Sequence, residues 1–341
     1  DEDIRIPVSN GNYSLAAKIL RPEGPGPYGA IILNHGAAVS AEERRTESPE
    51  LLIHTAAHFA RRGYVVVMPL RRGFGATGGE FAEDAGTCRN PDYRRGETAA
   101  AEDVMAAYEY ARTLPYVDGS RMILAGQSAG AVAALFAAGT RAPQGLVAVL
   151  AFAAGRGGDP VRHPGVPCAV EPLAKVFSDL GRTVKAPVLF HYAANDLFFG
   201  ERTTQLWFER FNAGGARGQY VLQPPFGDNG HYIFSDGAGS RYWVPAVERF
   251  LRLTRGERIE VEFEADFEDA KHCTGFRYNV RGVYERRTRG EEGIKKTRSP
   301  VPAERRADLL RSLEGAAQSA LDKVVVDATG GETGTAIQPE T

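Results

Sequence analysis

Short, continuous apolar segments alternate with segments of helical periodicity along most of this sequence. Six apolar segments follow one another, at residues 30–34, 64–68, 121–125, 146–150, 188–192 and 220–222. Helical patterns lie between them, as at 99–114 and 130–138, and a last helix is expected at 242–253. Strands that are apolar on both faces and separated by helices are typical of a parallel sheet with helices on both sides. The pattern predicts a mostly parallel α/β domain over residues 1–256.

The character of the sequence changes after Gly256. Residues 260–267 and 276–286 alternate charged with apolar side chains, which predicts two amphipathic strands, and residues 303–324 have the one-sided apolar pattern of a helix. We therefore expect residues 257–341 to form a small α+β appendage with a flexible tail and no visible chemistry. Its leucines would dock on the main domain or on a second subunit, so a dimer is one option and the oligomeric state stays open.

Composition excludes several classes of function. The formal net charge is −2 and 25% of the residues are charged, so no strong field favours nucleic acid. The basic run 286–289 is flanked by glutamates, which favours an exposed loop. No apolar stretch approaches the roughly 18–20 residues that span a bilayer. Three cysteines are too few and too scattered for a metal cluster. We expect no nucleic-acid partner, no membrane span and no metal.

Two further motifs could indicate a dinucleotide site and a zinc site, but each lacks a part that such a site requires. Residues 73–78 match G-x-G-x-x-G, but a dinucleotide site needs a helix that begins inside the motif, and a loop follows here. We expect this loop to edge the functional site, with Arg71 or Arg72 holding it. His54 and His58 have the spacing of a zinc pair, but the glutamate of a metalloprotease helix and a third ligand are missing.

A Gly-Gln-Ser-Ala-Gly pentapeptide at 126–130 lies between an expected strand and an expected helix. This context is typical of a nucleophile elbow, in which a tight turn exposes a serine, here Ser128. A serine needs a base that is held by an acid. Asp196 follows one expected strand directly and His231 lies just after the next, so the order is Ser, Asp, His. Asp179 and Asp228 are weaker candidates for the acid, since neither follows a strand so directly.

The segment Asn34-His35-Gly36-Ala37 closes the first apolar segment. A His-Gly turn here would present a backbone N–H as an oxyanion donor, and the helix start behind Ser128 would supply a second. Ala37 and Ala129 are therefore the expected oxyanion-hole pair. His35 is expected to be a structural turn residue.

Residues 4–253 resemble the dienelactone hydrolase-like branch of the α/β-hydrolase superfamily. The resemblance is carried by residues 34–36, 71–75, 126–130, 195–196 and 225–231. It implies the α/β-hydrolase fold and hydrolysis of carboxylic esters or lactones without cofactor or metal. Enzymes that cleave dienelactone use a cysteine nucleophile, whereas this sequence has Ser128, so a general esterase is the safer expectation. A peptidase or acyltransferase with the same triad, or a non-catalytic binding protein on the same fold, is the alternative.

Cys88 and Cys168 both fall in loops after apolar segments, and such loops leave the same edge of a parallel sheet. Sequences that this one resembles are often exported, and the chain does not begin with methionine. We therefore expect a Cys88–Cys168 disulfide, a free Cys273 and a secreted or periplasmic protein. A cytoplasmic protein with ordinary thiols is the alternative.

Overall fold

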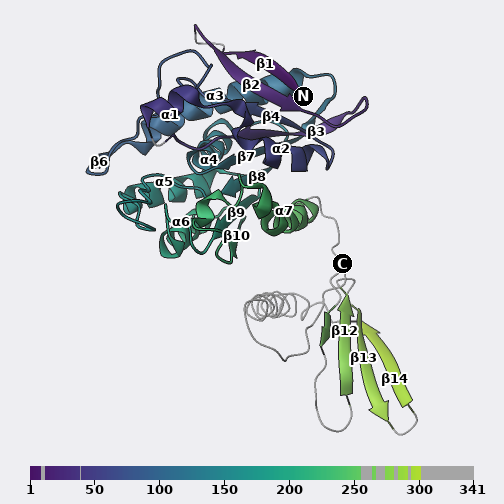
Figure 1. The fold of residues 1–341 in the computed structure, drawn as a ribbon. Helices are drawn as coiled ribbons and strands as arrows, with labels where there is room; N and C mark the ends of the chain where they lie inside the picture. The colour runs from purple at the N-terminus through teal and green to yellow at the C-terminus, as the bar shows by residue number, and fades with distance from the viewer. Residues whose placement is uncertain are drawn as a thin grey trace. The chain divides into compact units, whose positions relative to one another are not determined.

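The six apolar segments of the sequence become neighbouring strands of one eight-stranded sheet (Figure 1). In the computed structural model, the described residues are 1–8, 12–38, 40–254 and four strands beyond them. The chain divides into two compact units, Asp1–Thr254 and Arg255–Thr341. The sheet belongs to the first unit, and the four later strands belong to the second.

The sheet has the strand order β1-β2-β4-β3-β7-β8-β9-β10. Its strands are β1 (Glu2–Pro7), β2 (Ser14–Leu20), β3 (Tyr28–Asn34), β4 (Tyr64–Pro69), β7 (Val117–Gln127), β8 (Leu146–Phe152), β9 (Val188–Ala193) and β10 (Gly218–Gln223). The pairs β1–β2 and β2–β4 are antiparallel, and all the others are parallel. The mostly parallel sheet predicted from the sequence is therefore confirmed.

Helices connect the parallel strands, and a last helix follows β10. They are α1 (Ala41–Thr46), α2 (Ile53–Ala60), α3 (Tyr93–Thr113), α4 (Ala129–Arg141), α5 (Val170–Thr183), α6 (Glu201–Ala213) and α7 (Ser240–Thr254). Three short 3₁₀ helices are η1 (Pro49–Leu52), η2 (Gly230–Tyr232) and η3 (Gly237–Gly239). α3 begins six residues before the predicted start at residue 99. The carboxylate of Asp92 caps it by accepting a hydrogen bond from Arg95 N (3.1 Å), the role of an N-cap residue.

Alternate residues of the central strands are buried on opposite faces of the sheet. In β3, Ile32 packs in a core that includes residues of α3, α4, α5 and α6, whereas Ile31 and Leu33 pack with residues of α2 and α7. Figure 1 shows the sheet between these two groups of helices. Because both faces are covered, the strands are apolar throughout, and polar side chains gather at the ends of the strands.

The second unit contains an antiparallel sheet in the order β11 (Phe263–Ala265), β12 (Cys273–Asn279), β13 (Val283–Gly290) and β14 (Gly293–Pro300). The interval 276–286, expected as one strand, is divided between β12 and β13, which pair Tyr278 with Tyr284. The helix expected at 303–324 and its leucines lie outside the described residues.

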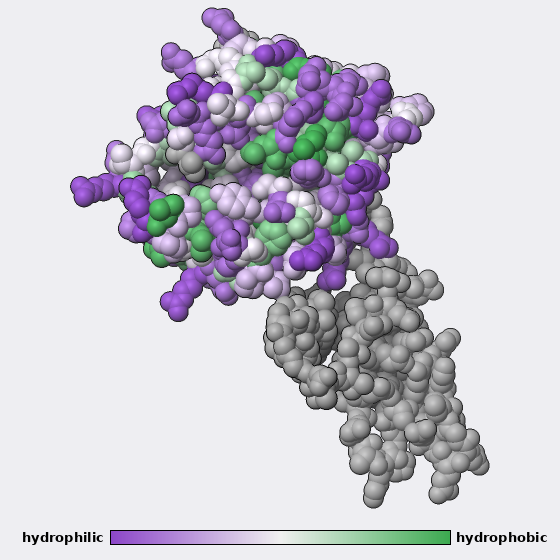
Figure 2. All heavy atoms as spheres, viewed as in Figure 1, coloured by the Kyte–Doolittle hydropathy of each residue, from purple (hydrophilic) through white to green (hydrophobic). Residues whose placement is uncertain are grey.

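Hydrophilic residues dominate the visible surface of the first unit, with hydrophobic residues in separate patches among them (Figure 2). None of the helices in the described part of the chain has the length and apolar character that crossing a membrane requires.

Candidate active site

Ser128 occupies the turn between β7 and α4. Its backbone has φ 57° and ψ −123°, a positive φ that residues with a side chain seldom adopt. Such a conformation costs free energy and persists only where the surrounding structure holds it. Here Ser128 N donates a hydrogen bond to Phe152 O (2.9 Å) on the neighbouring strand β8. The turn that the pentapeptide predicts is present, and it leaves the Ser128 side chain half-buried.

The two glycines of the pentapeptide allow this turn to close. A Cβ at Gly126 would lie 2.4 Å from the backbone of Gly130, and a Cβ at Gly130 would lie 2.2 Å from His35 O. Both distances are far below a van der Waals contact with backbone atoms. The close approach brings the start of α4 against the segment after β3, so the two expected oxyanion donors come from adjacent pieces of chain.

Asp196 and His231 form a buried pair at the carboxyl ends of β9 and β10. His231 Nδ1 lies 3.0 Å from Asp196 Oδ2 and 3.2 Å from Oδ1, and the residues are 4% and 2% exposed. Asp196 Oδ1 also accepts hydrogen bonds from Phe198 N (2.8 Å) and Phe199 N (3.2 Å). The carboxylate of Asp196 can only accept a hydrogen bond, so in this contact Nδ1 of His231 carries the hydrogen. The lone pair of the neutral ring is then on Nε2. This is the tautomer that a general base requires.

Polar contacts join the loop of His231 to its neighbours. Asn229 Oδ1 accepts hydrogen bonds from His231 N (3.1 Å) and Leu197 N (3.0 Å), and Gln127 Nε2 donates to His231 O (2.7 Å). Gln127 immediately precedes Ser128, so the nucleophile turn and the histidine loop touch. Among the described residues no hydrogen bond links the Ser128 hydroxyl to the His231 ring, so proton transfer between them stays a prediction.

The segment after β3 lies beside the serine. A Cβ at Gly36 would lie 3.4 Å from Ser128 Cβ, so Ala37, the next residue, is adjacent to the nucleophile turn. Ala129 is the first residue of α4, where backbone N–H groups have no partner within the helix and the helix dipole is positive. These positions suit the oxyanion-hole role expected for Ala37 and Ala129, which stays a prediction.

The glycine-rich loop at 73–78 closes on itself, with Gly73 N donating to Gly78 O (3.4 Å). The next helix, α3, begins only at Tyr93, so the helix start of a dinucleotide fingerprint does not lie inside the loop. The two arginines before the loop have separate partners. Arg72 binds the carboxylate of Asp103, and Arg71 binds the carbonyl groups of His35 and Gly36.

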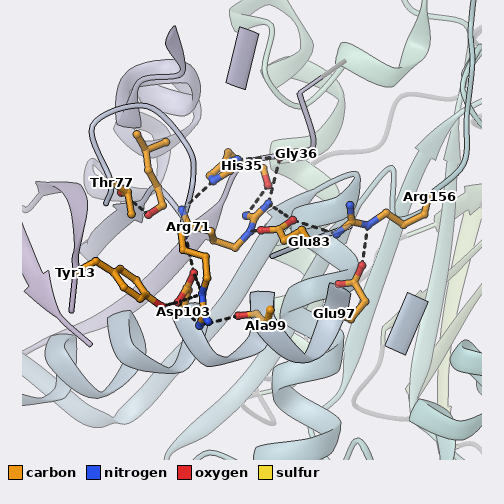
Figure 3. Close-up of polar contacts among 12 residues, drawn as sticks. Tyr13, His35, Gly36, Arg71, Thr77, Glu83, Glu97, Ala99, Asp103 and Arg156 are labelled. Atoms are coloured by element: carbon orange, nitrogen blue, oxygen red, sulfur yellow. Dashed lines mark hydrogen bonds and ion pairs between the residues drawn. The ribbon is translucent and has the colours of Figure 1, made fainter. Parts of the chain in front are cut away.

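A chain of buried charges lies behind the segment after β3 (Figure 3). The carboxylate of Glu83 forms ion pairs with both Arg71 and Arg156, and Arg156 also forms an ion pair with Glu97 (2.7 Å). Burial raises the pKa of Glu83, but the two guanidinium groups more than offset this and lower it to about 2. Burial raises the pKa of Glu97 despite Arg156. Sequence reasoning missed Glu83, Glu97 and Arg156, because each looks like an ordinary surface residue until its distant partner is known.

A disulfide joins Cys88 and Cys168, with an S–S distance of 2.08 Å and a Cα–Cα distance of 5.4 Å. Cys88 lies in the short hairpin of β5 (Gly86–Thr87) and β6 (Asn90–Pro91), and Cys168 lies just before α5. Cys168 N also donates to Gly157 O (2.9 Å). The disulfide thus ties the hairpin to the loop after β8, which carries Arg156. Cys273 lies in β12, and its side chain is outside the described residues.

Neither weaker candidate for the acid is buried as Asp196 is, since Asp179 is half-buried and Asp228 is exposed. Asp179, on α5, forms ion pairs with Arg94 and Arg182. The described part of the chain holds no group of three or more His, Cys, Asp or Glu residues arranged to bind a metal ion. His58 instead packs edge-to-face on Trp243, with ring centroids 5.6 Å apart.

Comparison with known proteins bears on the fold. The prolyl oligopeptidase family matches residues 50–154. None of the curated proteins matches the chain. Three similar solved structures each cover 74% of it, with TM-scores of 0.51–0.52. They are a protein assigned as a dienelactone hydrolase from Klebsiella pneumoniae (16% identity, 97% of that chain covered), Est1E from Butyrivibrio proteoclasticus with ferulic acid bound (18%, 99%) and an acylaminoacyl peptidase from Pyrococcus horikoshii (16%, 41%). These similarities confirm the α/β-hydrolase fold that the resemblance implied, and a protein assigned as a dienelactone hydrolase is among the similar structures.

Proposed function

We propose that this chain is a serine hydrolase that cleaves carboxylic esters or lactones through an acyl-enzyme on Ser128. The observation that carries the proposal is the buried Asp196–His231 pair, joined through Gln127 to a strained serine turn. A strained backbone and a buried acid–histidine pair both cost free energy of folding, so folding alone does not explain them. A histidine held by an acid near an exposed serine is the arrangement that makes the serine hydroxyl a nucleophile.

The reaction has two steps. His231 Nε2 accepts the proton of Ser128 Oγ while Oγ bonds to the carbonyl carbon, and the N–H groups of Ala37 and Ala129 hold the resulting oxyanion. The bond to the alkoxy group then breaks, and the alcohol leaves with the proton from His231. Water then attacks the acyl carbon while His231 accepts its proton, the bond between that carbon and Ser128 Oγ breaks, and the acid leaves as His231 returns the proton to Oγ.

Covalent labelling tests the proposal directly. A fluorophosphonate probe labels only an activated serine, so the intact chain should take one label and Ser128→Ala none. p-Nitrophenyl esters of rising acyl length then measure the size of acyl group that the site accepts. A folded chain that takes no label and hydrolyses no ester would instead be a binding protein on a hydrolase fold.

A peptidase is the second candidate, because the prolyl oligopeptidase family matches residues 50–154 and an acylaminoacyl peptidase shares the fold. The two activities differ in the leaving group, since an amine leaves only after protonation by His231. Hydrolysis of N-acetyl-alanyl p-nitroanilide should be compared with that of p-nitrophenyl acetate. A higher kcat/KM for the anilide would favour the peptidase, and acyl transfer to an added alcohol would favour an acyltransferase.

A further inference from the structure

The guanidinium group of Arg71 lies behind the segment that follows β3, and the residue is 0% exposed. Arg71 Nη1 donates to His35 O (2.8 Å) and Nη2 donates to Gly36 O (3.2 Å) (Figure 3). The planar fork of an arginine can bind two such oxygens at once, which the point charge of a lysine cannot do in the same geometry. Two successive carbonyl groups are therefore fixed by one side chain.

The ring of His35 reinforces the same contact. Its Nδ1 donates to Gly36 O (2.8 Å), and its Nε2 accepts a hydrogen bond from Arg71 N (3.2 Å). Burial, with the charge of Arg71, lowers the pKa of His35 to about 3, so the ring stays neutral with one donor and one acceptor. Gly36 O thus receives hydrogen bonds from both Arg71 and His35.

Holding the Gly36 carbonyl also sets the direction of the next N–H group. In a planar trans peptide, the C=O of one residue and the N–H of the following residue point in opposite directions. With Gly36 O turned toward Arg71, the N–H of Ala37 points away from Arg71. Ser128 lies against Gly36, with its Cβ 3.4 Å from where a Gly36 Cβ would be.

Arg71 is itself held in place by ion pairs. Its Nε donates to Glu83 Oε1, and its Nη2 lies 3.2 Å from Glu83 Oε2. Glu83 Oε2 also binds Arg156 (3.1 Å), which binds Glu97. Each arginine has a carboxylate partner, as charges require when they are buried. The guanidinium group of Arg71 therefore has little freedom to leave the two carbonyl groups.

We propose that Arg71 is a positioning residue for the oxyanion hole, fixing the Gly36–Ala37 peptide so that the Ala37 N–H faces the carbonyl oxygen under attack. This inference rests on the proposed function. Donors that are already oriented lower the barrier because they need no rearrangement as charge develops on the oxygen. Arg71 would act without touching the substrate.

Arg72 provides a matched control. It is the neighbouring arginine, and it is also ion-paired, with the buried Asp103 (2.7 Å) and with Glu102 (3.0 Å). Its guanidinium group also donates to Ala99 O (3.3 Å), on α3, rather than to the carbonyl groups after β3. Replacing Arg72 disturbs a comparable ion pair and leaves the Gly36 carbonyl bound.

The experiment compares Arg71→Lys with Arg72→Lys in the full chain. Both variants keep their positive charge, but Arg71→Lys loses the fork on His35 O and Gly36 O. Loss of one oxyanion donor costs about 10²–10³ in kcat, so misorienting one should cost about 10–100-fold, with KM changed less than about threefold. The affinity of an aryl trifluoromethyl ketone, which forms an oxyanion on the serine, should fall by the same factor. Arg72→Lys should change neither value by more than about threefold.

Fluorophosphonate labelling distinguishes a failure of the proposed function from a failure of the inference about Arg71. A wild-type chain without label would overturn the proposed function and this inference together. A labelled wild-type chain, with kcat and ketone affinity unchanged in Arg71→Lys, would overturn the inference alone. If Arg71→Lys does not fold, Arg71→Gln takes its place, because its amide also lacks the fork on His35 O and Gly36 O and the remaining charges, Glu83, Arg156 and Glu97, still pair with one another. It should lower kcat and ketone affinity together, and unchanged values would likewise overturn the inference.

Discussion

Gln127 Nε2 donates a hydrogen bond to the main-chain oxygen of His231 across 2.7 Å, and both residues are buried. Gln127 is the last residue of β7, so this bond holds the histidine loop against the strand that leads into Ser128. The position of the base relative to the nucleophile thus depends on a side chain that takes no part in the chemistry.

Replacing Gln127 by methionine should therefore lower activity. The change keeps the approximate size of the side chain and leaves His231 O without its donor, at a cost of about 1–3 kcal/mol for a buried acceptor. We expect kcat/KM for a p-nitrophenyl ester to fall about tenfold or more. Gln223→Met is the control, because the Gln223 amide donates to Tyr242 O (3.2 Å) instead. Equal activities in the two variants would contradict the prediction.

Single replacements of the three predicted catalytic residues should each remove most esterase activity from a folded protein. Loss of the nucleophile or base costs on the order of 10⁴–10⁶ in rate, and loss of the acid somewhat less. The losses in Ser128→Ala, His231→Ala and Asp196→Asn should not add in double variants, because the three groups act as a unit. Steady-state kinetics with circular dichroism as the folding check measures this.

Asp179→Asn and Asp228→Asn serve as controls for the acid, since Asp179 is bound to Arg94 and Arg182 and Asp228 is exposed. Both should keep activity close to that of the wild type. The assignment of the nucleophile is falsified if Ser128→Ala keeps more than a few per cent of the activity in a contamination-controlled assay.

The central strands could be predicted because they are buried on both faces. β4 reads Tyr-Val-Val-Val-Met-Pro, and all its residues are buried, so composition alone indicates a strand. β1 and β2 were not predicted. β1 is at the edge of the sheet and mostly exposed, and its sequence is rich in charge. In β2 the apolar run is broken by Lys18, which is buried but pairs with Asp3 (2.9 Å) and Glu50 (3.1 Å).

The residues of the candidate site also fall into those that a local sequence pattern indicates and those that no local pattern indicates. Ser128, Asp196 and His231 could be proposed because each follows a recognisable strand in a fixed order. Glu83 and Glu97 could not, since their burial depends on Arg71 and Arg156, which lie up to 73 residues away in sequence. No local pattern marks a charged residue as buried when its partner comes from another loop.

The Cys88–Cys168 disulfide should stabilise the protein without being needed for bond breaking. The bridge spans 80 residues, and closing so long a loop stabilises by up to about 4 kcal/mol in the chain-entropy model. Cys88→Ala with Cys168→Ala should lower Tm by several degrees and keep fluorophosphonate labelling. We propose accordingly that the protein works in an oxidising compartment, secreted or periplasmic.

Intact-mass analysis after alkylation checks the bridge. One alkylated thiol without reductant, rising to three with it, supports the pairing. Three alkylated thiols without reductant, in denatured protein purified from an oxidising compartment, would show that the bridge does not form.

Acid should destabilise the fold from about pH 6.5 downward, because of two buried histidines. His191, in β9, is 0% exposed, its Nδ1 has no partner in the described structure, and burial lowers its pKa to about 3. The pKa of His35 is lowered to about the same value. Below pH 6.5 these two histidines bind protons in the unfolded chain but not in the folded chain, so their contribution to the free energy of unfolding falls as pH falls and levels off near pH 3.

The contribution of His191 to this pH dependence can be measured with one variant. Each such histidine contributes a slope of up to about 1.4 kcal/mol per pH unit within that window. His191→Leu removes one of the two, so the free energy of unfolding from urea titrations should depend less steeply on pH between about 6 and 4.5, by roughly one proton. His163→Leu, at an exposed loop histidine, is the control and should keep the wild-type slope. Identical slopes in wild type and His191→Leu would mean that His191 is protonated in the folded protein, or that water reaches its ring.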